Sequence, residues 1–268
     1  MSISLEGKTA IVTGACNGIG LAIVRKFADA GANVMMAGVN EAVLEEESDR
    51  LGGPDKGVVT FTGDLSEKLT VANLMAATIG AFERVDILVN ANHSVMFSDP
   101  LATNGDVLEE LLARNVTGTF RLSRRVARRM IKQAEGLEDD AMAGAIVNIS
   151  SILSESRQQQ LTSYAISCAA LNQLTQSLAS TLAPYNIRVN AIAMGMAVNA
   201  CLHAALKERE EEEGELADLA SMPWVGNAED AADAALFLAT DAQVVTTGQI
   251  LEVNAGKVDQ TATEIPTY

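Results

Sequence analysis

Short apolar runs recur along the chain, and amphipathic segments of ten or more residues separate them. The runs that predict strands are Thr9–Thr13, Asn33–Ala37, Val58–Thr62, Val85–Asn90, Ala145–Ser150, Ile187–Ile192 and Gln249–Val253. The segments that predict helices are Ile19–Ala30, Glu41–Leu51, 66–80, 104–132, 162–184 and 228–240. Strands that alternate with helices predict βαβ units with right-handed crossovers. We therefore expect an α/β fold, a doubly wound parallel sheet of about seven strands with helices on both faces.

The pattern shows no internal repeat and no linker rich in Pro, Gly or Ser, so residues 1–268 read as a single domain. Residues 196–222 depart from the alternation and contain an almost entirely acidic run from Lys207 to Glu215. That stretch is interpreted either as a solvated helix face or as a mobile substrate lid. Residues 257–268 form a polar tail that is disordered or reaches a neighbouring subunit.

Composition narrows the class of protein. Hydrophobic residues make up 48% of the chain and aromatics only 4%, so Ala, Val, Leu, Ile and Met must fill the core, which suits helices packed on a parallel sheet. The net charge of −16 argues against nucleic acid and against an anionic membrane surface as partners. We find no signal pattern and no apolar run long enough to span a bilayer. Cys16, Cys168 and Cys201 have no metal-ligand spacing, so we expect no metal site. Any disulfide scheme would leave one of them unpaired, so we expect a protein of the reducing cytoplasm.

A glycine-rich turn, Thr13 to Gly20, joins the first predicted strand to the first predicted helix. Gly14 permits the tight turn, Gly18 lets the backbone approach a pyrophosphate, and Gly20 allows close helix packing. The helix N-terminus then faces the phosphates with unpaired N–H groups and the positive end of its dipole. The alternative is a tight turn with no ligand.

At this turn the chain resembles the short-chain dehydrogenase/reductase family, whose signature is T-G-x-x-x-G-I-G. The resemblance extends from Gly7 to Gly256 and covers the segments Gly63–Leu65, Asp86–Asn90, Asn115–Gly118, Val147–Ser151, Ile187–Ile192 and Thr247–Gln249. It implies a Rossmann-like fold that uses NAD or NADP, if a cofactor is still bound. The cofactor contacts that it implies are Gly14, Asn17, Gly18, Ile19, Gly20, Asp64 and Asn90.

The same resemblance assigns the catalytic roles to Tyr164, Ser151 and Asn115. The tyrosine exchanges a proton with an alcohol or ketone, the serine polarises the substrate oxygen, and the asparagine supports a relay water. A phenol is a poor base at neutral pH, and the family supplies a lysine one helical turn later to favour the phenolate. Here Cys168 occupies the lysine position and cannot supply that positive charge. Loss of such a partner costs about 10²–10⁴ in rate.

Further departures surround the same site. Asn92 and His93 replace small residues after the fourth strand, Met194 replaces a proline, Asn199 replaces a threonine, and Val39 provides neither an acid nor an arginine for the ribose. His93 is interpreted as a loop residue, as a substitute base or as a group that blocks the cofactor. Cys168 is interpreted as a packing residue or as a redox or catalytic thiol. Tyr164 and Ser151 are either working groups or inherited remnants.

One predicted helix carries five arginines: Arg121, Arg124, Arg125, Arg128 and Arg129. We place them opposite Phe120, Ala127 and Met130. The face is interpreted as a solvated surface, as a subunit contact with acidic groups, or as a site for acyl-CoA phosphates. The resemblance implies a homo- or hetero-oligomer, dimeric or tetrameric, assembled through helices 104–132 and 162–184.

Three functions stay open. The favoured one is a catalytically impaired subunit that assembles with an active relative in an alcohol or hydroxyacyl dehydrogenase, hydroxyacyl-CoA included. The second is an active NAD(P)-dependent oxidoreductase for a secondary alcohol or ketone, with Tyr164 as acid and base. The third is a regulator that binds a nucleotide without chemistry.

Overall fold

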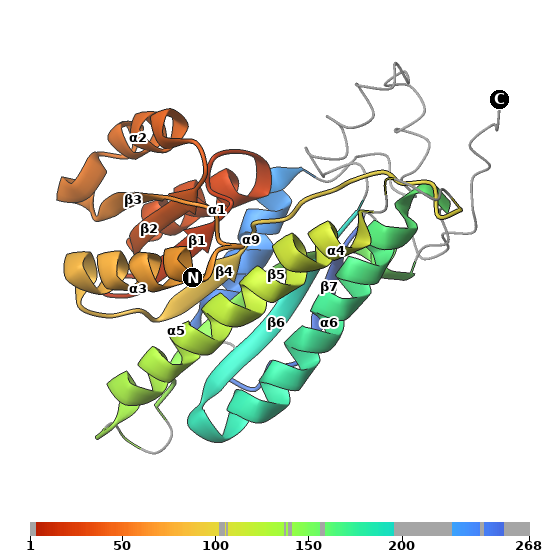
Figure 1. Ribbon diagram of the computed structural model, residues 1–268. Coiled ribbons are helices and arrows are strands. Elements are labelled where there is room, and N and C mark those ends of the chain that lie inside the picture. The colour runs from red at the N-terminus through yellow and green to blue at the C-terminus, as the bar shows by residue number, and fades with distance from the viewer. Residues whose placement is uncertain are drawn as a thin grey trace.

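The computed structural model describes residues 4–101, 105, 107–136, 138, 141–155, 159–195, 227–241 and 244–254. Its centre is a seven-stranded parallel sheet with the strand order β3-β2-β1-β4-β5-β6-β7 (Figure 1). The strands are β1 (Thr9–Thr13), β2 (Asn33–Gly38), β3 (Val58–Thr62), β4 (Ile87–Asn90), β5 (Gly144–Ser151), β6 (Ile187–Met194) and β7 (Ile250–Val253). The predicted doubly wound α/β fold is confirmed.

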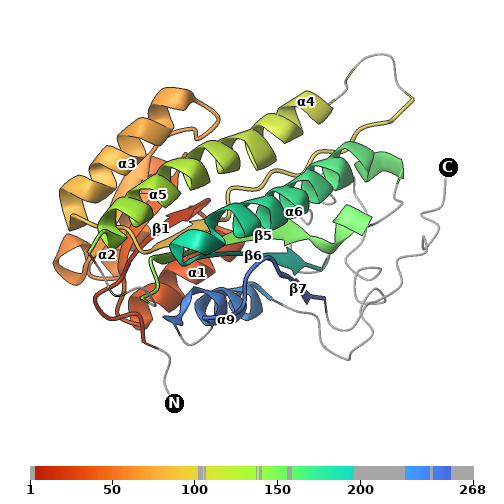
Figure 2. The same cartoon turned by 90° about the horizontal axis from the view of Figure 1, so that it is seen from below.

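Helices cover both faces of the sheet, as Figure 2 shows from below. They are α1 (Gly18–Asp29), α2 (Glu41–Arg50), α3 (Lys68–Phe82), α4 (Leu108–Leu111), α5 (Gly118–Ala134), α6 (Thr162–Leu182) and α9 (Ala228–Ala239). Residues of α1 and α9 pack into one core cluster, and residues of α3, α5 and α6 pack into another. The predicted lid at 196–222, the predicted tail at 257–268, Asn199 and Cys201 lie outside the described residues.

The central strands bury side chains on both faces, which explains their continuous apolar sequences. In β1, Ala10 and Val12 pack into one core cluster while Ile11 packs into the other. Successive strand residues point to opposite faces, so a strand between two helix layers needs an apolar residue at every position. This arrangement brings the carboxyl ends of the strands to one edge, where doubly wound sheets bind their ligands.

The segment predicted as one helix over 104–132 is divided in the structure. A short helix, α4, leads into a π-helical turn at Leu112–Thr117, and α5 follows it. The turn contains Asn115, whose side chain is fully buried. Inserted π turns occur often at functional sites. The helical periodicity of the sequence did not predict this π turn, because periodicity does not report the long-range contacts of Asn115.

The prediction for the arginine helix is correct for two apolar residues and wrong for the third. Ala127 and Met130 are buried in α5, but Phe120 is 39% exposed. The Arg124 guanidinium lies 5.5 Å from the centroid of the Phe120 ring. Residues four apart are neighbours on a helix surface, so Phe120 lies at the border of the buried face beside an arginine rather than opposite it.

Within the described part of the chain, no helix is both long and apolar enough to cross a membrane. The same residues contain no cluster of three or more His, Cys, Asp or Glu side chains suited to a metal ion.

Candidate active site

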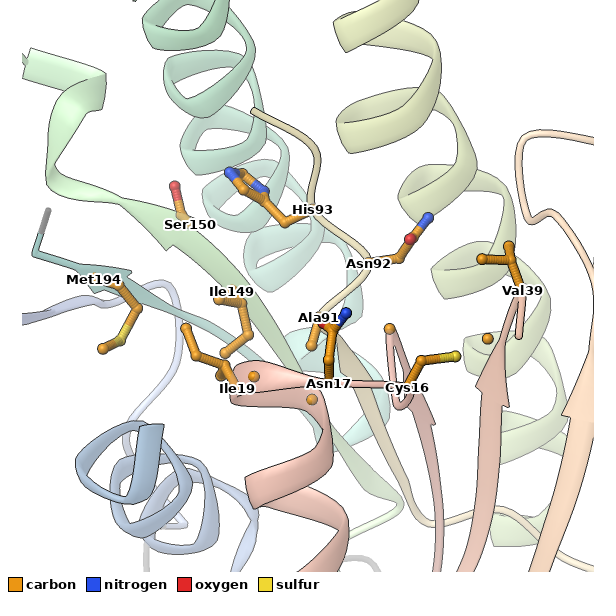
Figure 3. Close-up of a pocket in the computed structure, with 14 residues that line it drawn as sticks. Cys16, Asn17, Ile19, Val39, Ala91, Asn92, His93, Ile149, Ser150 and Met194 are labelled. Carbon is orange, nitrogen blue, oxygen red and sulfur yellow. The ribbon is translucent and has the colours of Figure 1, made fainter. Parts of the chain in front are cut away.

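A cavity of about 200 Å³ lies where β1, β2, β4, β5 and β6 end. Figure 3 shows Val39 and Cys16 toward one end of the cavity and His93, Ser150 and Met194 toward the other. Its described lining is Gly14, Cys16, Asn17, Gly18, Ile19, Gly20, Gly38, Val39, Ala91, Asn92, His93, Ile149, Ser150 and Met194. None of these side chains is acidic, and the only one that can become positively charged in water is an imidazole.

The glycine-rich turn lines the cavity, and internal packing dictates two of its glycines. Gly14 has a φ of +64°, and an added Cβ would lie 2.4 Å from the Ala91 carbonyl oxygen. An added Cβ at Gly20 would lie 2.2 Å from the Gly14 carbonyl oxygen. Substitution at either position would therefore force backbone apart, whether or not a ligand is bound.

The first turn of α1 fits an anionic group. Asn17 is the N-cap residue of α1, and its side chain makes no capping hydrogen bond. Neither does the first turn contain an acidic side chain. The backbone N–H groups at this N-terminus therefore retain the capacity to bind phosphate oxygens. The residues at this end of the cavity fit the pyrophosphate of a dinucleotide.

Five of the predicted cofactor contacts line the cavity: Gly14, Asn17, Gly18, Ile19 and Gly20. The described lining does not include Asp64 or Asn90. The Asp64 carboxylate is exposed and accepts a hydrogen bond from the Ser66 backbone N–H at 2.8 Å, which lowers the pKa of that carboxyl. Asn90 is buried in the interior, where its amide donates to Ser123 Oγ and to Asn148 Oδ1.

Tyr164 lies in α6 with no exposed surface. Its hydroxyl oxygen is 2.6 Å from His93 Nε2, and the two rings meet edge to face with their centroids 5.1 Å apart. Tyr164 shares a buried cluster with the apolar or weakly polar side chains Leu111, Leu153, Leu161 and Cys168. The phenol therefore faces an imidazole rather than the cavity.

Ser151 and Asn115 also make hydrogen bonds within the protein. Ser151 Oγ donates to the Met194 carbonyl oxygen at 3.3 Å and accepts from the Leu153 N–H at 3.2 Å. The Asn115 side chain accepts from the Ser94 N–H at 2.8 Å and donates to the Ser94 carbonyl oxygen at 2.9 Å. The structure brings the three predicted catalytic residues into one region, but each of these two is bonded to neighbouring backbone.

Cys168 occupies the predicted lysine position and is fully buried beneath Tyr164. Its sulfur is 3.8 Å from His93 Nε2. Burial raises the pKa of the Cys168 thiol to about 12, which outweighs the opposing hydrogen bonds from Tyr164 and Ser167. The thiol is therefore protonated at neutral pH, where it is a weak nucleophile. This environment favours the interpretation of Cys168 as a packing residue.

Two backbone anchors hold the loop that carries His93. On one side, Thr13 Oγ1 accepts from the N–H groups of Ala91 and Asn92 at 3.0 and 3.1 Å. On the other side, the Asn115 side chain bonds to both the N–H and the carbonyl oxygen of Ser94, a pair of bonds that we call the Asn115 clamp. Burial lowers the pKa of His93 from 6.5 to about 4, so its imidazole is neutral at physiological pH.

The structure adds residues to the site that the sequence had not singled out. Ser150 lines the cavity, and its buried hydroxyl has no hydrogen-bond partner among the described residues. Thr13 and Ser94 position the His93 loop. Serines and threonines are common in such segments, so residue type alone could not have marked these three.

Comparison with known proteins supports a redox ancestry. A family model described as enoyl-(acyl carrier protein) reductase matches residues 14–257. Galactitol 2-dehydrogenase (L-tagatose-forming) of Cereibacter sphaeroides is 35% identical over 254 residues, which cover 94% of this chain and 95% of that protein. A 3-oxoacyl-(acyl-carrier-protein) reductase of Aquifex aeolicus is 33% identical over 265 residues, which cover 96% and 99% of the two chains.

Solved structures agree with this likeness. The crystal structure of 3-ketoacyl-(acyl-carrier-protein) reductase from Brucella melitensis, complexed with NADH, superimposes with a TM-score of 0.83 at 26% sequence identity. The superposition covers 95% of this chain and 99% of that one.

Proposed function

The chain belongs to the short-chain dehydrogenase/reductase family, and on that premise we propose that it is a catalytically impaired member that assembles with an active one. The related dehydrogenases and reductases support an ancestry in hydride transfer to or from a nicotinamide cofactor. The proposed roles of individual residues rest on the local geometry rather than on the fold, because one fold serves many chemistries.

One observation carries the proposal: the hydroxyl of Tyr164 is bonded to His93 at 2.6 Å and has no access to the cavity. A general acid or base must come within about 2.6–3.2 Å of the proton that it transfers. A substrate oxygen would have to displace His93 to reach the Tyr164 hydroxyl. The residue below, Cys168, contributes no positive charge at neutral pH, so the phenol also lacks the electrostatic partner that the family uses.

The test is turnover by the purified chain. Oxidation of galactitol, reduction of a 3-oxoacyl thioester and interconversion of other secondary alcohols and ketones should all proceed at least about 100-fold below the ordinary range of 1–10³ s⁻¹. Changing Tyr164 to Phe should leave the residual rate within about twofold. Ordinary turnover that this substitution abolishes would overturn the proposal.

The same geometry gives the second candidate function its one supporting observation. The 2.6 Å contact positions the His93 imidazole to receive the phenol proton during alcohol oxidation, and the lowered pKa of His93, about 4, makes it a weak base in that role. An enzyme of this kind would lose its turnover in both the Tyr164→Phe and the His93→Gln variants. The impaired subunit would lose nothing measurable in either.

Membership of the family implies NAD or NADP as cofactor, and Gly18 and the first turn of α1 would hold the pyrophosphate of either one. When bound, a nicotinamide cofactor would supply the hydride. Val39 is 70% exposed at the end of β2 and offers no charge to either cofactor. The described lining has no cation to offset the additional phosphate of NADP, so of the two dinucleotides NADP should bind more weakly.

The partner would contact α5 and α6. Arg124, Arg125 and Arg128 are exposed on α5, and no acidic side chain lies in that helix. The neighbouring α6 contains no charged residue along its 21 residues. A two-fold contact centred on α5 would bring the arginines of two identical copies together, whereas a partner subunit with a carboxylate-bearing face would complement them.

A further inference from the structure

We propose that this cavity binds an adenine nucleotide that lacks nicotinamide, with ADP-ribose as the simplest member of the class, and that His93 excludes the nicotinamide ring. The inference rests on the proposed function in that both concern the same cavity. The class of ligand is new, and His93 is the residue that would select it. The two ends of the cavity differ: one fits a pyrophosphate, and the other does not fit a nicotinamide ring.

The pyrophosphate end retains the features that an ADP moiety needs. The uncapped first turn of α1 supplies backbone N–H groups, and Gly18 has a φ of +52° at the point of closest approach. The Cys16 sulfur packs against Gly38, where an added Cβ would lie only 2.3 Å from it. The chain is therefore shaped closely around this end, and no charged side chain among the described lining would repel the phosphates.

The opposite end is closed to the reacting ring. Hydride transfer requires the nicotinamide to reach the substrate carbon, whose oxygen would be bonded to Tyr164, so the ring must come close to the phenol. His93 lines the cavity, whereas Tyr164 lies behind it with no exposed surface. The 2.6 Å contact leaves no room for another atom between the imidazole and the phenol.

His93 is also held in place. Its backbone is fixed on one side by Thr13 and on the other by Asn115, as described above. The anchoring asparagine is itself bonded to Ser167 Oγ in α6 at 3.1 Å. The imidazole cannot withdraw by a simple shift of its loop, so a dinucleotide would have to break the contact with Tyr164 and turn the side chain.

Ser150 offers a hydrogen-bonding group to a ligand that extends beyond the pyrophosphate. It is 2% exposed, and its hydroxyl has no partner among the described residues. A buried polar group without a partner is costly and invites a hydrogen bond from a ligand. Figure 3 shows Ser150 toward the His93 end of the cavity. The hydroxyl groups of a terminal ribose have the chemistry to satisfy it.

The experiment compares dissociation constants for ADP-ribose and NADH by isothermal titration calorimetry. The wild-type chain should bind ADP-ribose at least as tightly as NADH. His93→Ala should improve NADH binding about tenfold and change ADP-ribose binding by less than about threefold. His93→Gln is the matched control, because its amide can keep both the length and the hydrogen bond to Tyr164, and it should behave as the wild type does.

Two outcomes would overturn the inference. One is wild-type binding of NADH tenfold tighter than ADP-ribose, which would show that the nicotinamide ring contributes despite His93. The other is no binding of ADP-ribose at millimolar concentration, which would show that the cavity is not a nucleotide site. Neither outcome bears on the impaired-subunit proposal, because turnover of the wild-type chain and of Tyr164→Phe tests that separately.

Discussion

The two ends of the cavity differ in what their polar groups do. At the glycine-turn end, the first turn of α1 lacks a side-chain cap and lines open space. At the Tyr164 end, the three predicted catalytic side chains are bonded to His93, to the Met194 backbone and to the Ser94 backbone. Packing requires glycine at Gly14 and Gly20, so the glycine motif is evidence about the fold and the phosphate end. It says little about the chemistry at the other end.

The largest effect is expected from restoring an acid–base pair at the Tyr164 end. The double variant His93→Ala/Cys168→Lys removes the imidazole and restores the positive charge one turn after the phenol. We expect turnover with NADH or NADPH and a ketone panel to rise at least about 100-fold over His93→Ala/Cys168→Met, because a tuned acid–base pair contributes about 10²–10⁴. Methionine matches lysine in length without its charge. Equal rates in the two double variants, with both folded by circular dichroism, would contradict the expectation.

The glycine-turn end is tested by Gly14→Ala. The added Cβ would clash with the Ala91 carbonyl oxygen at 2.4 Å, and the residue would keep a left-handed φ of +64°. Strain and overpacking together should lower the free energy of unfolding by about 2–4 kcal/mol in denaturant titrations without any nucleotide present. Gly80→Ala is the control, since an added Cβ there meets nothing within 4 Å in helix α3 and should be neutral or slightly stabilising.

His93 predicts a pH dependence that belongs to the Tyr164 end alone. Its folded pKa of about 4 lies below the ordinary 6.5, so the unfolded chain takes up the proton first as the pH falls. The wild type should therefore be most stable above pH 6.5 and lose about 1–3 kcal/mol relative to His93→Gln between there and about pH 4. The denaturant midpoint of the wild type, measured across that window, should fall more steeply toward acid than the midpoint of His93→Gln. Parallel curves would refute the expectation.

The smallest expected effect concerns the outer face of α5. Arg124→Gln/Arg125→Gln/Arg128→Gln should change the stability of the isolated chain by less than about 0.5 kcal/mol, because all three side chains are exposed. A charge-reversed copy with glutamate at the same three positions should associate with the wild type in sedimentation velocity at low salt, and the association should weaken as salt rises. Wild-type self-association that is stronger than this mixed association would contradict the proposed interface.

Much of the fold could be predicted from the sequence, because each central strand is a short apolar run between turns. The bounds of β1 and β3 agree with the predicted Thr9–Thr13 and Val58–Thr62. The π turn around Asn115 could not be predicted, since Asn115 bonds to Ser94, 21 residues earlier, and such a long-range contact leaves no local pattern in the sequence. Phe120 was misplaced because it lies at a border that helical periodicity does not resolve.

The candidate site was predictable as a set of residues and not as an arrangement. The sequence indicated Tyr164 and the missing lysine, and it left the role of His93 open among three interpretations. Only the structure brings His93 to Tyr164, across 71 positions of the chain. The assigned roles of the glycine-turn residues, Asp64 and Asn90 remain predictions.

The Asn115 clamp has a consequence for assembly. Ser167 in α6 bonds to Asn115, Asn115 bonds to Ser94, and Ser94 is the residue next to His93. Two hydrogen-bonded steps thus connect the helices proposed to meet a partner with the imidazole that closes the cavity. We expect a partner subunit that shifted α6 against the π turn to move the His93 loop as well, so that contact between subunits would change access to the cavity.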